Sequence, residues 1–260
     1  MKETLSSAET LAAAEQAALT KTKLGTRKTL VLAALAGAYI AMGGTLSLLV
    51  GYGFAQAAAG NPGLQKLLSG AMFPLGLILV VLAGAELFTG NNAVLMPGAL
   101  GRRYGWGKVA RDWTLVWLGN FAGALFFTYF LVVLPGVLSS EMWREAACNI
   151  AQAKVSLPWS TVFLRGVGAN WLVCLAVWLG MSANDVPGRM IGLFFPIMCF
   201  VVIGYEHCIA NMFFIPLGML LGAPVSVAEL FAGNLVPATL GNIVGGGLFV
   251  GGLYWYLNRK

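Results

Sequence analysis

The amino-acid sequence predicts an all-α integral membrane protein, with six transmembrane helices arranged as two inverted three-helix repeats. Three observations lead to this fold class: an apolar composition, six long apolar runs and a motif that occurs twice. The chain has 260 residues, of which 58% are hydrophobic and 10% charged, and its mean hydropathy is +0.79. A soluble domain usually carries about 25% charged residues, so this composition is typical of a chain that lies in a bilayer.

The apolar runs set the number of membrane spans. A helix needs about 20 apolar residues to cross the hydrocarbon core. The runs that can do so are 28–51, 67–98, 113–134, 159–183, 190–221 and 233–257. They predict an N-terminal segment 1–27, a membrane domain 28–257 and a tail 258–260. The 34 glycines suit helices whose backbones approach closely.

The N-terminal segment, MKETLSSAETLAAAEQAALTKTK, carries acidic residues and has no continuous apolar core. It therefore differs from a secretory signal peptide and is predicted to form an amphipathic helix at the membrane surface. The four cysteines, Cys148, Cys174, Cys199 and Cys208, show no paired spacing. The sequence predicts neither a disulfide framework nor a metal site, and no cofactor is expected.

Basic residues predict the orientation of the chain. Most of them lie on the side of the termini: Lys2, Lys21, Lys23, Arg27, Lys28, Arg102, Arg103, Lys108, Arg111, Arg189, Arg259 and Lys260. The other side carries Lys66, Arg144, Lys154 and Arg165. Because cytoplasmic loops are enriched in Lys and Arg, both termini are expected in the cytoplasm of a cell whose inner (plasma) membrane the chain crosses several times. The basic residues are spread over short loops, so no nucleic-acid partner is expected.

Three pairs of matching segments recur in the same order along the chain. They are Gly-x-Glu-x-x-x-x-Asn at 84–91 and 204–211, Phe-Pro at 73–74 and 195–196, and LGNFAG at 118–123 with LGNIVG at 240–245. Each copy holds three spans, an odd number, so the second copy enters the membrane from the opposite side. Such inverted repeats usually form a transport path at their interface.

The second and fifth apolar runs are too long for one comfortable crossing. They are predicted to break near Glu86–Asn91 and Glu206–Asn211. Backbone that leaves a helix at membrane depth needs internal hydrogen-bond partners. We therefore expect Glu86, Asn91, Glu206 and Asn211 mainly to brace the broken helices. A direct place in a substrate path is the alternative.

His207 is the single histidine of the chain, and the matching position of the first copy holds Leu87. An ionisable side chain at mid-span is costly and usually functional. Burial disfavours the imidazolium form, whereas a nearby anion favours it. A monovalent weak-acid anion could therefore share or take up a proton at His207 and cross apolar constrictions as the neutral acid.

Three further polar residues are candidates for the same path. Asn170 in the fourth span is expected to hold the other ring nitrogen of His207, with helix–helix hydrogen bonding as the alternative. Thr89 in the first break is expected to coordinate a small oxyanion, and Gly90 to give the loop unusual dihedral angles. Lys154, just before the fourth span, would raise the local anion concentration, unless it is a solvated loop lysine.

The segments AELFTGNN, ANWLVCLAVW, GYEHCIANMFFIPLG and LGNIVGGGLFVG resemble the formate/nitrite transporter family. The match extends from about Leu30 to Tyr256. The resemblance implies an aquaporin-like arrangement and a homopentamer, in which each subunit has its own pore while apolar residues and membrane lipids fill the fivefold axis. It implies a channel or transporter, not an enzyme, that passes formate, nitrite or hydrosulfide and exchanges protons with them.

By the same resemblance, the polar site residues are His207, its support Asn170, the loop threonine Thr89 and the outer-side Lys154. The hydrophobic constrictions correspond to Phe73, Leu77, Leu87, Val173 and Phe200. The loop reads FTGN, not the FTST of the best-known formate channels. Formate is the first expectation for the substrate, and nitrite and hydrosulfide are the alternatives.

Two other classes of membrane protein fit the sequence less well. A neutral-solute pore of the aquaporin type would carry paired Asn-Pro-Ala motifs, and the chain has only Asn-Pro-Gly at 61–63. A haem- or metal-binding membrane enzyme would need several histidines. A passive channel and a proton-coupled transporter both fit these residues, and the N-terminal segment is a gate only by analogy.

Overall fold

The computed structural model describes residues 4–259, which form a helical bundle with an isolated β-bridge between Thr4 and Ala183. The elements are α1 (Ser7–Lys21), α2 (Thr26–Tyr52), α3 (Ala55–Ala59), α4 (Pro62–Met72), α5 (Leu75–Ala83), α6 (Phe88–Val94), α7 (Met96–Leu100), α8 (Trp106–Phe126), η1 (Phe127–Val133), α9 (Glu141–Val155), α10 (Trp159–Ser182), α11 (Val186–Ile203), α12 (Cys208–Leu220), η2 (Glu229–Leu235), α13 (Val236–Ile243), η3 (Val244–Gly252) and α14 (Leu253–Asn258). The η elements are π-helical. Lys2 and Lys260 lie outside the described residues.

Six helical segments of the described chain are long and apolar enough to cross a membrane: Thr26–Tyr52, Gly63–Ala83, Trp106–Val133, Trp159–Ser182, Val186–Ile203 and Glu229–Asn258. The six-span all-α fold predicted from the sequence is confirmed. The second and fifth predicted runs, 67–98 and 190–221, are each divided between a spanning segment and a short half-helix, α6 or α12.

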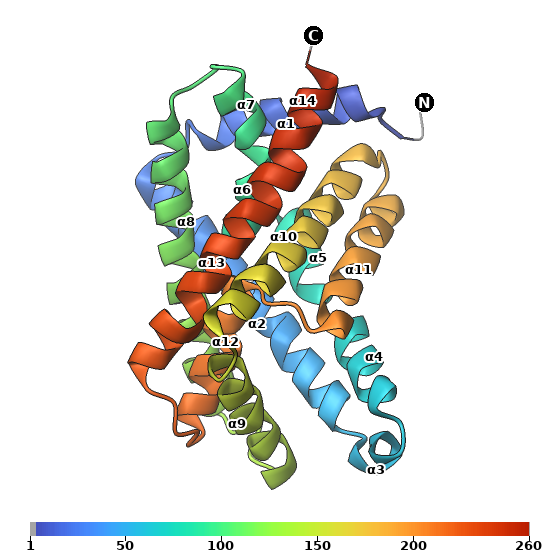
Figure 1. The fold of residues 1–260 in the computed structure, drawn as a ribbon, viewed down its shortest axis with the longest axis vertical. Helices are drawn as coiled ribbons and strands as arrows, with labels where there is room; N and C mark the ends of the chain where they lie inside the picture. The colour runs from blue at the N-terminus through green and yellow to red at the C-terminus, as the bar shows by residue number, and fades with distance from the viewer. Residues whose placement is uncertain (1–3, 260) are drawn as a thin grey trace.

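Both termini and α1 lie at one end of the molecule, here called the terminal end, and α9 lies at the opposite, distal end (Figure 1). Since α1 precedes α2 and α9 precedes α10, the two copies place matching elements at opposite ends of the bundle. Helix α1 buries Leu11, Ala14 and Ala18, and Glu15 forms an ion pair of 2.7 Å with Arg103. The predicted amphipathic helix is therefore docked on the bundle.

Each broken helix stops at a glycine in the left-handed region, Gly84 with φ 79° and Gly204 with φ 83°. Glycine adopts this conformation without the steric cost of a Cβ. The chain becomes helical again within a few residues, so Asn91 and Asn211 lie in the half-helices. The predicted position of the breaks was therefore slightly late in the sequence, because the half-helices start as soon as their first N–H groups find acceptors.

Asn120 of α8 supplies that acceptor in the first copy. Its Oδ1 accepts the backbone N–H of Phe88 at 2.9 Å, the first residue of α6. Its Nδ2 donates to the carbonyl oxygens of Ala33, at 2.8 Å, and of Glu86, at 2.9 Å. One fully buried amide therefore satisfies a donor and two acceptors of interrupted backbone.

Asn242 of α13 makes the same three bonds in the second copy. Its Oδ1 accepts the N–H of Cys208 at 2.9 Å, the first residue of α12. Its Nδ2 donates to the carbonyl oxygens of Gly166, at 2.8 Å, and of Glu206, at 3.0 Å. The repeated Leu-Gly-Asn motif thus has a structural cause: its asparagine joins the break to two neighbouring helices.

The glycines of the same motif let the helices cross at close range. A Cβ at Gly123 of α8 would overlap the carbonyl of Ala34 in α2, and a Cβ at Gly245 would overlap the carbonyl of Val167 in α10. Backbone atoms cannot rotate away as a side chain can. These two crossings therefore fix the distance at which each asparagine meets its break.

We expect Gly123→Ala to lower the free energy of unfolding by about 1–3 kcal/mol, because the added methyl pushes α8 away from α2. The measurement is thermal unfolding in detergent. Gly107→Ala in the same helix is the matched control, since nothing lies within 4 Å of its added Cβ. It should be neutral or stabilise the helix by up to about 1 kcal/mol. Equal stability of the two variants would contradict the close crossing.

Candidate functional site

Two cavities enter the bundle from opposite ends. The terminal pocket has a volume of about 500 Å³ and is lined by residues of α1, α5, α6, α10 and α11 together with the first break. The distal pocket has a volume of about 420 Å³ and is lined by residues of α2, α4, α9, α10, α11 and α12 together with the second break. Each pocket therefore reaches one of the two interrupted helices.

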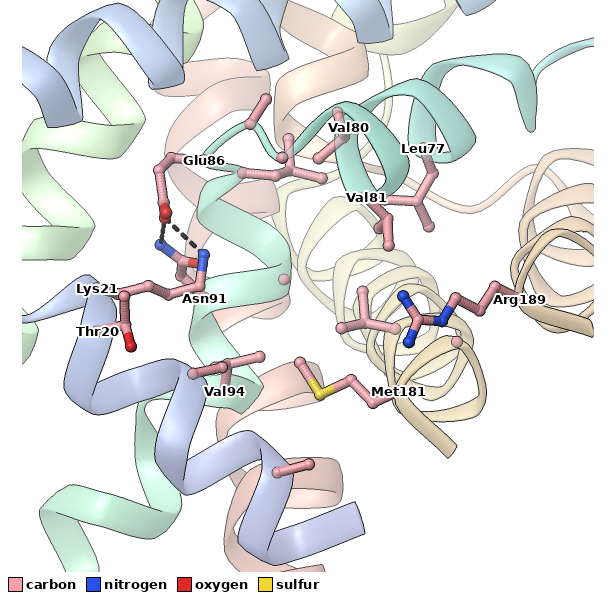
Figure 2. Close-up of a pocket in the computed structure, with 18 residues that line it drawn as sticks. Thr20, Lys21, Leu77, Val80, Val81, Glu86, Asn91, Val94, Met181 and Arg189 are labelled. Atoms are coloured by element: carbon pink, nitrogen blue, oxygen red, sulfur yellow. Dashed lines mark hydrogen bonds and ion pairs between the residues drawn. The ribbon is translucent and has the colours of Figure 1, made fainter. Parts of the chain in front are cut away.

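A buried charged cluster lies at the terminal pocket. Lys21, the last residue of α1, donates to Glu86 Oε2 at 2.7 Å. Asn91 Nδ2 donates to the same oxygen at 2.8 Å and to Asp112 Oδ1 at 2.9 Å. Figure 2 shows Lys21 and Asn91 converging on Glu86 from α1 and α6. One oxygen of Glu86, Oε2, thus binds two groups of the protein.

The distal pocket has a matching cluster. Lys154 Nζ lies 3.0 and 3.1 Å from the two oxygens of Glu206. Asn211 donates to Glu206 at 2.7 Å and to Asn234 Oδ1 at 2.6 Å, and Asn234 Nδ2 donates to Glu206 at 3.1 Å. Lys154 is therefore neither a free cation nor a solvated loop lysine, since Glu206 compensates its charge.

Sequence reasoning missed Lys21. It is the counterpart of Lys154, and the repeat could have pointed to it, because each lysine precedes a repeated Glu. The separations differ, however: 65 residues from Lys21 to Glu86 and 52 from Lys154 to Glu206. The first copy carries the additional helix α3 between these positions, so a fixed spacing does not reveal the pair.

His207 is 2% exposed and caps the N-terminus of α12. Its Nδ1 accepts the N–H of Ala210 at 3.0 Å, and its Nε2 lies 2.9 Å from Thr89 Oγ1. Because Nδ1 uses its lone pair as an acceptor, a neutral ring carries its hydrogen on Nε2 and donates it to Thr89. The hydroxyl hydrogen of Thr89 is then available for another acceptor.

Asn170 does not hold the histidine ring, contrary to the sequence-based expectation. Its Nδ2 donates to the carbonyl of Thr89 at 3.2 Å, to Asn92 Oδ1 at 3.1 Å and to the carbonyl of Asn242 at 2.7 Å. The ring nitrogen assigned to Asn170 is occupied by the N–H of Ala210. Asn170 instead links α10 to α6 and α13, which positions Thr89 indirectly.

Thr89 lies in the first turn of α6, not in a loop. Gly90 is helical as well, and the unusual dihedral angles occur at Gly84. The expectation that these two residues lie in a loop was wrong because α6 begins at Phe88, immediately after the break; the coordination of an anion by Thr89 stays a prediction. A helical Thr89 has a fixed backbone, so its hydroxyl is better positioned than a loop hydroxyl would be.

The five apolar residues expected to form constrictions are all buried: Phe73, Leu77, Leu87, Val173 and Phe200. Phe73 and Phe200 line the distal pocket with their rings edge to face, centroids 5.7 Å apart. Leu77 and Leu87 line the terminal pocket. Phe73 and Leu77 are one helical turn apart yet border different cavities, so apolar side chains at this level lie between the two pockets. Their role as constrictions stays a prediction.

The chain is similar to known transport proteins over nearly its whole length. The family model described as formate/nitrite transporter matches residues 8–256. The chain is 47% identical over 270 residues to a protein named probable formate transporter from Methanothermobacter thermautotrophicus, covering 98% of this chain and 97% of the relative. It is 35% identical over 266 residues to the formate channel FocA of Escherichia coli, covering 94% and 91%.

Solved structures are also similar over nearly the whole chain. One, an FNT family ion channel, has a TM-score of 0.87 and 29% identity, covering 96% of this chain and 98% of the other. A second, a pentameric formate channel with formate bound, has a TM-score of 0.80 and 35% identity, covering 90% and 98%. The likeness therefore extends over nearly the whole helical bundle.

We expect Lys154→Ala to lower the free energy of unfolding by about 3 kcal/mol or more, because the buried carboxylate of Glu206 loses its cation. The measurement is again thermal unfolding in detergent. The double variant Lys154→Met with Glu206→Gln removes both charges and keeps an acceptor for Asn211, so it should recover most of the loss. If Lys154→Ala is as stable as the unsubstituted protein, the ion pair has no structural role.

Proposed function

Since this chain belongs to the formate/nitrite transporter family, we propose that it is a channel for small monovalent anions of weak acids, with formate as its main substrate. The support is the name of its relatives: a probable formate transporter, the formate channel FocA and a solved pentameric formate channel. The family consists of transporters and channels, not enzymes. The six spans make the chain a multi-pass membrane protein.

We infer that five copies assemble, each with its own path, because a structural relative is named a pentameric formate channel. The proposed location is the inner (plasma) membrane, with the terminal end in the cytoplasm. The supporting observation is the number of basic residues on that side, among them Lys23, Arg27, Lys28 and Lys108. The terminal pocket would then face the cytoplasm and the distal pocket the outside.

The observation that carries the proposed function is the contact between His207 and Thr89. A neutral imidazole N–H directed at Thr89 leaves the threonine hydroxyl as a donor beside apolar walls. An anion at this point would accept the hydroxyl hydrogen bond, and the imidazole would polarise that bond from behind. The N-terminal end of α12, which begins directly after His207, adds the positive end of a helix dipole.

Proton transfer to the anion requires one further step. The ring must first become imidazolium, and Nδ1 can take the extra proton only after its hydrogen bond from Ala210 opens. Nε2 can then pass its proton to Thr89 while the threonine hydroxyl proton goes to the carboxylate, which forms neutral formic acid and a neutral ring. We propose hydrogen-bond donation as the resting state and proton exchange as a step that loosens the cap of α12.

Nitrite and hydrosulfide are the alternative substrates, because they are also monovalent anions of weak acids. Gly90 is the reason to keep these two anions as candidate substrates beside formate. It lines the terminal pocket next to Thr89 and leaves space where a serine side chain would stand. The same flux measurement compares the three anions directly. A neutral-solute pore would instead pass water or glycerol without anion selectivity.

We expect His207→Leu to abolish selective formate flux, because the ring donor to Thr89 is lost. Leucine should be tolerated by the fold, since Leu87 adopts φ −109° and ψ 123° at the matching position and His207 has φ −108° and ψ 115°. His207→Asn keeps an N-cap acceptor but cannot be protonated, so it should retain some flux and lose its dependence on pH. The measurement is formate uptake into proteoliposomes across pH. Flux and pH dependence unchanged in His207→Leu would exclude the proposed role.

A further inference from the structure

The distal pocket holds more positive charge than its ion pair accounts for. Three basic residues line it, Lys66, Lys154 and Arg165, together with a single acidic residue, Glu206. Glu206 is bound to Lys154 at 3.0 Å. Lys154, the residue that the sequence suggests for attracting anions, therefore contributes little net charge to the cavity.

Arg165 is half-buried in the wall of this pocket and has no carboxylate partner among residues 4–259. Its Nη1 donates weakly to the carbonyl of Gly204 at 3.5 Å, which leaves most of the guanidinium N–H groups for other acceptors. Lys66 is exposed on α4, so solvent and salt screen its charge more strongly. The least compensated and best fixed cation of the pocket is thus Arg165.

The backbone of Arg165 has a structural role that does not require its side chain. Its carbonyl accepts the N–H of Glu206 at 3.4 Å, as the carbonyl of Leu32 accepts the N–H of Glu86 at 3.2 Å in the first copy. The same position of the fold is therefore occupied by an apolar residue in one half and by a cation in the other. The guanidinium is an addition to the scaffold, and it faces the cavity that also reaches His207.

Within residues 4–259, the terminal pocket also has a lysine paired with a carboxylate and an arginine with no carboxylate partner. Lys21 is bound to Glu86, whereas Arg189 of α11 lines the pocket and donates Nε to the carbonyl of Ala183 at 3.1 Å. Figure 2 shows Arg189 across the cavity from the Lys21–Glu86 pair. The two arginines are not matching positions of the repeat. Both belong to the second copy, Arg165 to α10 and Arg189 to α11, so each pocket has an arginine that the duplication did not supply.

We propose that Arg165 recruits the substrate anion into the distal pocket, while Lys154 serves mainly to neutralise Glu206. This inference rests on the proposed transport of small anions and names the residue that concentrates them. A guanidinium suits a carboxylate such as formate because it can donate two parallel N–H bonds to the two oxygens. From this contact the anion has a path within the same cavity to His207.

The test compares formate permeability of proteoliposomes that contain Arg165→Gln, Arg165→Lys or Arg144→Gln, at low and at high ionic strength. Glutamine keeps a donor for the carbonyl of Gly204 and removes the charge, whereas lysine keeps the charge. Arg144 is an exposed basic residue that does not line the pocket, so its substitution is the matched control for loss of a positive charge at the same end.

We expect Arg165→Gln to lower permeability at low ionic strength by roughly threefold to tenfold, the lower end of the effect of a charged cleft. The difference should shrink in high salt, because the Debye length falls from about 30 Å at 0.01 M to about 3 Å at 1 M. Arg165→Lys should restore most of the permeability, and Arg144→Gln should not reproduce the loss.

Two results would overturn the inference about Arg165 and leave the proposed function intact. A loss that is independent of salt and shared by Arg165→Lys would show that the side chain braces the loop at Gly204, and unchanged permeability of Arg165→Gln would remove it from recruitment. Failure of the unsubstituted protein to carry formate, nitrite or hydrosulfide would instead contradict the proposed function, and this inference with it.

Discussion

The structure depends on one constraint: backbone polar groups exposed by a broken helix inside a membrane must find partners within the protein. Asn120 and Asn242 meet this constraint with the same three hydrogen bonds in each copy. The glycine crossings hold these asparagines at bonding distance, and the repeated glutamates fix the segment between the helices. Once the breaks are satisfied, N-terminal helix ends and side chains can be placed at mid-membrane depth, where continuous helices would present only apolar faces.

The duplicated scaffold is nearly symmetric, and its chemistry is not. The residues before the two half-helices share one backbone conformation, yet one is Leu87 and the other His207. The polar clusters differ in the same manner, since Asp112 stands where the second copy has Asn234, and an apolar Leu32 stands opposite Arg165. Symmetry therefore supplies the position and the backbone geometry, while single substitutions supply the proton-carrying ring and the uncompensated charge.

Much of this arrangement follows from the sequence, because hydropathy and the repeated motif report burial and backbone breaks directly. The spans, the two breaks and the singular position of His207 are of this kind. The side chains of Glu86 and Glu206 were expected to brace freed backbone, but they bind Lys and Asn side chains, and Asn120 and Asn242 pair with the backbone instead. What could not be predicted is which groups pair in the folded chain: Lys21 with Glu86 across an added helix, Ala210 with the ring nitrogen three residues before it, and Asn170 with three acceptors. Spacing alone also placed Thr89 in a loop, since no local pattern shows that Asn120 lets α6 begin at once.

In the proposed function, it is an advantage that the uncompensated cation lies away from the apolar region between the two pockets. A unit cation placed 4 Å from an anion attracts it by about 4 kcal/mol even at an effective dielectric constant near 20, and such a well would slow its release. The Lys–Glu pairs at both breaks are neutral overall, and between the pockets the anion meets hydrogen-bond donors and apolar walls. Dipolar donors lower the cost of dehydration without forming a deep well, as conduction requires. An uncompensated guanidinium therefore belongs in the wide pocket, where it concentrates anions, and not among the apolar side chains between the two pockets, where it would trap them.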